Sequence, residues 1–115
     1  MPVPLYQAKA EFFRTLGHPA RIRVLELLCE REHAVHELLD HIEIEQSNLS
    51  QQLGVLRRAG LVTHRREAGE VLYAISVPEV RDLLLAARRI LLGIISHQEG
   101  LKLQLGADRP GDSRS

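Results

Sequence analysis

The chain has 115 residues, of which 44% are hydrophobic and 26% are charged, a length and composition typical of one folded domain. The 15 Lys and Arg residues balance the 15 Asp and Glu residues, so the net charge does not point to a polyanionic partner. One cysteine excludes an intrachain disulfide and a cysteine-based zinc finger. No apolar run approaches the roughly 20 residues of a membrane span, and the N-terminus does not resemble a signal peptide. We therefore expect a cytoplasmic protein without a membrane partner.

Helical spacing of apolar residues predicts four helices in the first half of the chain. We place them at residues 6–16, 19–31, 33–41 and 45–59. The sequence Gly17-His18-Pro19 separates the first two, because glycine suits the end of a helix and proline suits the first turn of the next one. His18 is expected to serve this turn, and Gly60 to end the fourth helix.

The periodicity then changes to that of β-strands. Residues 61–65 and 71–75 predict two strands, with the tip of a hairpin at 67–70. Short helices followed by a two-stranded hairpin and a further helix are typical of one architecture. We predict a mainly α fold with a β-hairpin wing, namely a winged helix-turn-helix of order ααααββα.

The last helix is expected to run from about residue 79 to about residue 103, followed by a polar tail at 106–115 that is expected to be disordered. The folded domain then covers residues 1–105. Apolar side chains occupy more than one stripe of this helix, so that one stripe needs a partner unless the helix is wholly internal in a monomer. We expect a twofold homodimer formed through the first and last helices. The residues expected at its interface are Phe12, Phe13, Leu84, Ile90, Leu91 and Ile94.

The fourth helix is predicted to carry a polar face opposite an apolar one. A rotation of about 100° per residue places Leu49, Leu53 and Leu56 together, and hydroxyl, amide and guanidinium groups opposite them. Such groups pair with base edges and phosphates, and Gly54 on the polar face would allow the backbone to approach closely. The residues expected to contact DNA are Gln46, Ser47, Asn48, Ser50, Gln51, Gly54, Arg57, Arg58, Arg65 and Arg66.

Local charge supports this interpretation. Residues 46–66 hold four arginines and no carboxylate, a charge of +4, whereas residues 26–45 hold seven carboxylates against Arg31, a charge of −6. The neutral total therefore hides a polarised chain whose positive part coincides with the predicted recognition helix and wing. An ordinary solvated helix face is the alternative.

Three segments resemble the motifs of one known family. They are residues 17–25 (GHPARIRVL), similar to G-x-P-x-R-x-x-I-L; residues 46–62 (QSNLSQQLGVLRRAGLV), similar to S-x-x-S-x-H-L-x-x-L-x-x-x-G-L-V; and residues 65–73 (RREAGEVLY), similar to R-x-G-x-x-x-Y. Together they resemble the ArsR/SmtB family of bacterial transcriptional regulators over about residues 8–97. The resemblance implies a homodimer on double-stranded operator DNA, usually a repressor, often relieved by a metal ion or another inducer. Gln51 stands where the family has a histidine.

The resemblance also bears on metal binding. The family pattern E-L-C-V-C-D-L falls on residues 32–38 (EHAVHEL), so both thiols are replaced, and the family site in the last helix lacks its ligands as well. The imidazole and carboxylate groups that remain would suit nickel or zinc, although each histidine has an ordinary solvated position as its alternative. The candidate ligands, expected on the third helix and near the end of the last one, are His33, His36 and Asp40, or His97.

The sequence thus predicts a homodimeric, sequence-specific DNA-binding transcriptional regulator, with nickel or zinc as one alternative signal. It also leaves open control by a partner or co-regulator protein, control by an organic or redox signal, and a winged-helix module that binds a protein rather than DNA. An enzyme is not expected. Residues 36–40 come close to the H-E-x-x-H pattern of metalloproteases, but Asp40 replaces the second histidine.

Overall fold

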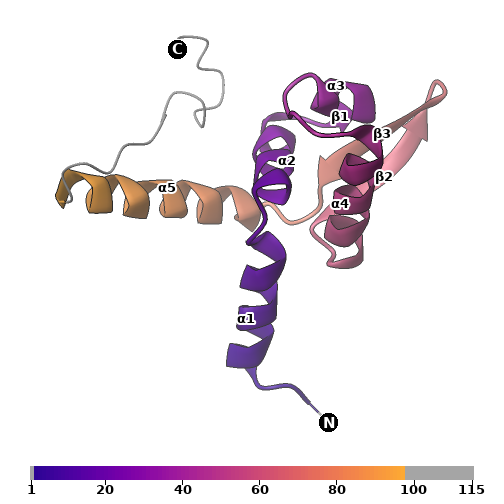
Figure 1. Ribbon diagram of the computed structural model, residues 1–115. Coiled ribbons are helices and arrows are strands. Elements are labelled where there is room, and N and C mark those ends of the chain that lie inside the picture. Colours follow the sequence, from indigo (N-terminus) through magenta and orange to yellow (C-terminus); the bar gives the residue numbers. More distant parts are fainter. Residues whose placement is uncertain (1, 98–115) are drawn as a thin grey trace. The chain divides into compact units, whose positions relative to one another are not determined.

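The computed structural model describes residues 2–97 (Figure 1). The chain divides into two compact units, one up to Val77 and one from Pro78, and each is described by itself. The elements, in chain order, are α1 (Leu5–Leu16), α2 (Pro19–Glu30), β1 (His33–Ala34), α3 (Val35–Leu39), α4 (Gln46–Arg58), β2 (Val62–Glu67), β3 (Glu70–Ile75) and α5 (Glu79–His97). The mainly helical winged helix-turn-helix is confirmed, and within the described residues the observed bounds lie within two residues of the predicted ones, except in the third helix.

The core of the first unit lies between α2, α3, α4 and the wing strands (Figure 1). Helix α2 packs against α4 and β3, and α3 packs against α4. The apolar faces of these helices supply side chains that are fully removed from solvent: Val24, Leu25, Leu38, Leu49, Leu53 and Leu56. Burying each leucine contributes roughly 1.5–3 kcal/mol, so the leucine face of α4 holds the opposite face of that helix outward.

Helix α2 begins as the sequence predicts. His18 is its N-cap, and the His18 Nδ1 accepts a hydrogen bond of 3.1 Å from the Ala20 backbone N–H. This bond satisfies one of the N–H groups that have no partner within the helix. Pro19 occupies the first helical position, where its missing N–H has no cost.

Helix α4 ends in a Schellman motif. Gly60 has a φ of +81°, a left-handed conformation that glycine adopts without strain. The Gly60 N–H donates to the Arg57 carbonyl and the Leu61 N–H donates to the Leu56 carbonyl, both at 3.0 Å. Leu61 is itself buried, and the chain turns sharply there from α4 into the wing.

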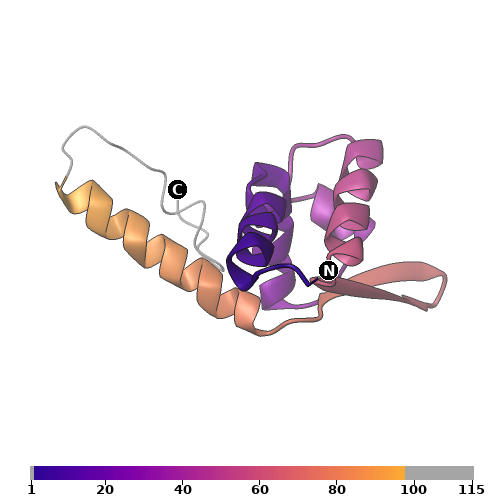
Figure 2. The same ribbon diagram turned by 90° about the horizontal axis from the view of Figure 1, so that it is seen from below.

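The wing is a hairpin of β2 and β3 that projects beyond the helices (Figure 2). The two strands pair in register from Val62↔Ile75 to Glu67↔Glu70. The turn between them consists of Ala68 and Gly69, with φ values of 52° and 83°. Two positive φ values in succession are the signature of a type I′ turn, which matches the twist of the strands. The predicted hairpin tip is confirmed, although Ala68 takes a conformation that residues with a Cβ disfavour.

The third predicted helix, 33–41, is wrong at both ends. His33 and Ala34 form strand β1, which pairs antiparallel with β3, and α3 covers only Val35–Leu39. Arg31 closes α2 with a fully extended backbone, so the chain leaves the helix as a strand. Ala34 is the N-cap of α3, and its N–H donates to the Glu37 carboxylate at 2.8 Å. The helix therefore begins at Val35. The wing sheet therefore has three strands in the order β1-β3-β2.

The second unit consists, in its described part, of α5. No helix among residues 2–97 is long and apolar enough to cross a membrane. The predicted end of this helix near residue 103, the domain boundary at residue 105 and the polar tail at 106–115 all lie outside the described residues.

Candidate DNA interface

The outer face of α4 is exposed, as its sequence predicts. Leu49, Leu53 and Leu56 have no solvent exposure, while seven of the eight residues expected to contact DNA from this helix are exposed and Gly54 is half-buried. The exposed seven are Gln46, Ser47, Asn48, Ser50, Gln51, Arg57 and Arg58. Packing of the leucine face therefore presents hydroxyl, amide and guanidinium groups to solvent, whereas contact with DNA stays a prediction.

Gly54 and Arg58 are neighbours on this face. A Cβ built on Gly54 would lie 3.2 Å from the Arg58 Nη1, so the guanidinium of Arg58 folds back along the helix over the glycine. The missing side chain thus leaves room for a cation on the surface of α4.

Asn48 makes a contact within the helix that the sequence did not predict. The Gln52 Nε2 donates to the Asn48 Oδ1 at 2.9 Å, and Gln52 is only 9% exposed. A buried amide needs such a partner because leaving it unpaired is costly. The available signal was the spacing of four residues, which places Asn48 and Gln52 on the same side of a helix. The carbonyl oxygen of Asn48 is thus engaged, and its amino group is the part that can reach a base or phosphate.

The last turn of α4 contacts the wing through Arg57. The Arg57 Nη1 lies 2.7 Å from the Nε2 of His64 on β2. The His64 ring is stacked on Tyr73 of β3, with ring centroids 5.4 Å apart and an angle of 18° between the planes. The residues expected to contact DNA include Arg57 but not Tyr73, and His64 is expected from the sequence to face either solvent or a phosphate.

Arg65 and Arg66, the two wing cations, have different surroundings. The Arg65 guanidinium forms ion pairs with Glu32 at 2.6 Å and Glu67 at 3.1 Å, and the hydrogen bond that Arg65 donates to Glu32 raises the pKa of Arg65. Arg66 is exposed and forms no ion pair with any residue between 2 and 97. The separation of charge along the sequence is therefore incomplete in space, because the acidic segment reaches the wing through Glu32. Within the same range, Arg66 is the wing arginine with an unengaged guanidinium.

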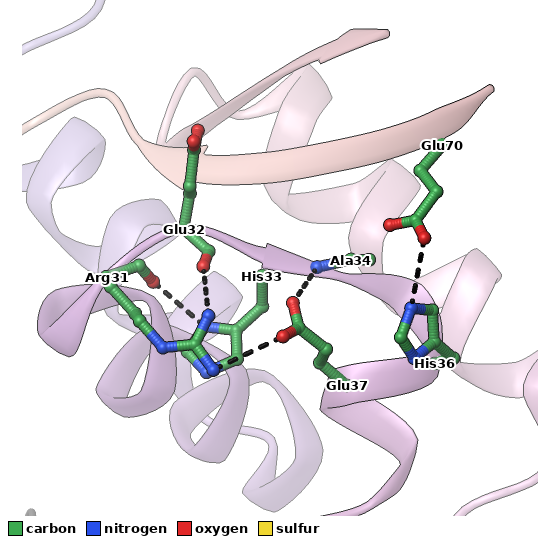
Figure 3. A network of polar contacts seen from close by, with 7 residues as sticks. All are labelled: Arg31, Glu32, His33, Ala34, His36, Glu37 and Glu70. Atoms are coloured by element: carbon green, nitrogen blue, oxygen red, sulfur yellow. Dashed lines mark hydrogen bonds and ion pairs between the residues drawn. The ribbon is translucent and has the colours of Figure 1, made fainter. Parts of the chain in front are cut away.

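The predicted metal ligands His33 and His36 do not share a helix. His33 is buried in β1, where its Nδ1 lies 2.8 Å from the Arg31 carbonyl oxygen, while His36 on α3 is exposed with its Nε2 3.4 Å from a Glu70 carboxylate oxygen (Figure 3). Burial lowers the pKa of His33. The Ala34 N–H and the Arg31 guanidinium lower the pKa of Glu37 in the same network.

The remaining predicted metal ligands are also not gathered into a site. Asp40 is exposed at the end of α3, and its backbone N–H bonds to carbonyls of that helix. The His97 Nδ1 lies 2.8 Å from the Gly93 carbonyl oxygen of its own helix. Within residues 2–97, no three His, Cys, Asp or Glu side chains lie where they could hold one metal ion. The expectation that His33 and His36 lie on one helix is therefore wrong, while metal binding by these residues or by His97 stays a prediction.

The residues expected at a dimer interface leave apolar surface exposed in the single chain. On α1, Phe13 is 54% exposed and stands edge-on to the half-buried Phe12. On α5, Leu84 is half-buried, and the remaining three predicted residues are exposed together with two further leucines: Ile90, Leu91, Ile94, Leu85 and Leu92.

Comparison with known proteins identifies the family. Residues 18–64 match the family described as "Bacterial regulatory protein, arsR family". Rv0081 of Mycobacterium tuberculosis, described as an uncharacterized HTH-type transcriptional regulator, is 56% identical over 94 residues, which cover 81% of this chain and 82% of that protein. The crystal structure of Rv0081 superposes with a TM-score of 0.75 at 54% identity, covering 84% of this chain and 97% of that one.

Two repressors are also similar. The biofilm growth-associated repressor of Agrobacterium fabrum is 39% identical over 88 residues, or 73% of this chain and 75% of that protein. The crystal structure of the transcriptional repressor BigR from Xylella fastidiosa has a TM-score of 0.69 at 38% identity and covers 74% of this chain and 87% of that one. The chain thus belongs to the ArsR family of bacterial regulatory proteins and is a DNA-binding transcriptional regulator, not an enzyme.

Proposed function

We propose that a homodimer of this chain binds double-stranded operator DNA in the cytoplasm, with α4 in the major groove and the wing on the backbone. The observation that carries the proposal is the outer face of α4, which is exposed, free of carboxylates and ends in Arg57 and Arg58. An α-helix fits the major groove, and amide, hydroxyl and guanidinium groups match base edges and phosphates. The face has neither the carboxylates nor the large exposed apolar groups expected of a protein-binding module.

The double variant Arg57→Ala/Arg58→Ala tests the proposal. Binding to duplex DNA should weaken, and the slope of log affinity against log salt should become shallower by about 0.9 for each phosphate that is no longer bound. Fluorescence anisotropy over a range of salt concentrations measures both quantities. The matched control is Lys9→Ala/Arg14→Ala, which removes the same charge from exposed positions of α1. Equal affinity and slope in the two double variants would refute the assignment.

Gln51 should read a base rather than a phosphate, because its amide can pair with adenine through two hydrogen bonds. We expect Gln51→Ala to lose about 1–3 kcal/mol on the operator and little on unrelated duplexes. An equal loss on both kinds of DNA would instead make Gln51 a residue that positions the helix.

The homodimer is proposed because α1 and α5 each expose apolar side chains in the single chain. A second copy related by a twofold axis would cover them and would carry a second α4 to a second half-site. Ile94→Asp should dissociate the dimer, since it places a carboxylate in an apolar interface without a partner. Sedimentation velocity measures the mass, and Ser96→Asp adds the same charge two residues away. An unchanged dimer in the folded Ile94→Asp variant would reject this interface.

A divalent metal as the regulating signal has no support in the geometry of residues 2–97, where no three ligand side chains converge. Equilibrium dialysis of the purified dimer against nickel and zinc, each followed by a DNA-binding measurement, tests whether either metal is bound and changes DNA affinity.

A further inference from the structure

The contact between Arg57 and His64 has a defined direction. An arginine guanidinium has five N–H donors, no acceptor, and stays protonated in proteins. The short distance of 2.7 Å between the Arg57 Nη1 and the His64 Nε2 therefore requires that Nε2 accepts. The His64 ring in this arrangement is neutral, with its hydrogen on Nδ1. One of the five donors of Arg57 is used, and four remain for another acceptor.

The His64 ring is itself held in place by the wing. His64 and Tyr73 are directly paired across β2 and β3, so their side chains stand on the same face of the sheet. The two rings stack with an interplanar angle of 18°, and Tyr73 is half-buried on the central strand of the sheet. The exposed Arg57 side chain is thus connected, through the His64 ring, to Tyr73 on the central strand of the wing.

The location of Arg57 makes this arrangement relevant to DNA. Arg57 is exposed in the last turn of α4, where the chain turns sharply toward the wing at Gly60. An unrestrained arginine loses much rotamer freedom when it binds a phosphate, and a side chain that is already oriented loses less. Guanidinium groups bind phosphates through two parallel N–H donors, and the free donors of Arg57 are sufficient for such a pair.

We propose that His64, stacked on Tyr73, is a positioning residue that orients the Arg57 guanidinium for a DNA phosphate. The inference rests on the proposed function, because it assigns a task to the same DNA-binding face. It adds that the wing contributes to binding by preparing an arginine of the recognition helix as well as through its own cations.

The test uses the full chain and a labelled duplex of arbitrary sequence, because a phosphate contact does not depend on base sequence. His64→Phe keeps a ring that can stack on Tyr73 and removes the acceptor. We expect its affinity to fall by about twofold to tenfold, because Arg57 would then lose more rotamer freedom on binding, with a salt slope close to that of the wild type. Arg57→Ala should instead make the slope shallower by about 0.9. His64→Gln, which restores an acceptor, should recover part of the affinity.

A double-mutant cycle separates positioning from direct contact. In the Arg57→Ala background, His64→Phe should have no further effect, and Tyr73→Phe, which keeps the stacked ring, is the control that should match the wild type. A full loss from His64→Phe in the Arg57→Ala background would overturn the inference and assign His64 its own DNA contact. An unchanged affinity of His64→Phe in the wild-type background would also overturn it. If Arg57→Ala changes neither affinity nor slope, the proposed contact of Arg57 fails first, and the inference fails with it.

Discussion

Replacing Gly54 with alanine should change stability and DNA binding in opposite directions. Glycine inside a helix is less favourable than alanine by about 0.8–1.0 kcal/mol. The new Cβ would lie 3.2 Å from the Arg58 Nη1, which is the far end of a flexible side chain and can move by a few tenths of an ångström. We therefore expect Gly54→Ala to raise the free energy of unfolding by up to about 1 kcal/mol, or a Tm several degrees higher.

The same methyl group should weaken binding to DNA. It projects from the outer face of α4, where the backbone would approach the major groove, and it displaces the guanidinium of Arg58. A contact to a base edge is worth about 1–3 kcal/mol, so disturbing one should reduce operator affinity by about fivefold or more.

Urea unfolding and fluorescence anisotropy on one preparation measure the two effects. Gly93→Ala is the matched control: Gly93 also lies within a helix, and its Cβ would meet no atom of the described residues within 4 Å. It should give a similar gain in helix stability without the loss in DNA affinity. If Gly54→Ala binds DNA as tightly as Gly93→Ala does, the outer face of α4 does not approach DNA closely and the reasoning fails.

The wing and the strand beside it give three further predictions. Ala68→Asn should stabilise the fold by about 0.5–1 kcal/mol, because asparagine tolerates the left-handed conformation at the first turn position. A β-branched residue does not tolerate it, so the Tm should rise in Ala68→Asn and fall in Ala68→Val. Glu32→Gln should raise affinity for duplex DNA by about twofold to fivefold, because the Arg65 guanidinium loses the closer of its two carboxylate partners. The control is Glu30→Gln, which removes an equal charge two residues away and should give a smaller gain in affinity. Burial lowers the pKa of His33, so the unfolded chain binds a proton at His33 more readily than the folded chain does. The contribution of neutral His33 to the free energy of unfolding is therefore complete above about pH 6.5 and is lost as the pH falls below that value. His33→Phe should flatten this part of the pH profile of urea unfolding, whereas an unchanged profile would show that His33 is not the group responsible.

Several features of the fold were predictable because they depend on neighbours in the chain. Helical periodicity and the residues that flank it are local, so the bounds of α2 and α4 followed from Pro19 and Gly60 and from the leucines of α4. The exposed face of α4 followed as well, because any residue opposite a buried leucine stripe must face solvent. The motifs of the recognition helix and wing were sufficient to name the family.

Different features were decided by segments that are distant in sequence. Strand β1 exists because His33 and Ala34 pair with β3, nearly forty residues later, and helical spacing alone favoured a helix there. The ion pair between Glu32 and Arg65, 33 residues apart, brings a carboxylate of the acidic segment to a wing arginine, which the linear charge of residues 46–66 did not predict. The same long-range pairing places His33 in a buried strand, so that His33 and His36 do not share the helix that their spacing favoured.

The sequence by itself determined the bounds of α1, α2 and α4, the polar face of α4 and the family that the chain resembles, because spacing and capping act over a few residues. Only the tertiary structure decided which of the polar groups are engaged. Arg65 forms an ion pair with Glu32, and Arg57 bonds to His64 of the wing. The physical reason is that a side chain's partners depend on how strands and helices pack in space, and strand pairing brings together residues that no local pattern relates.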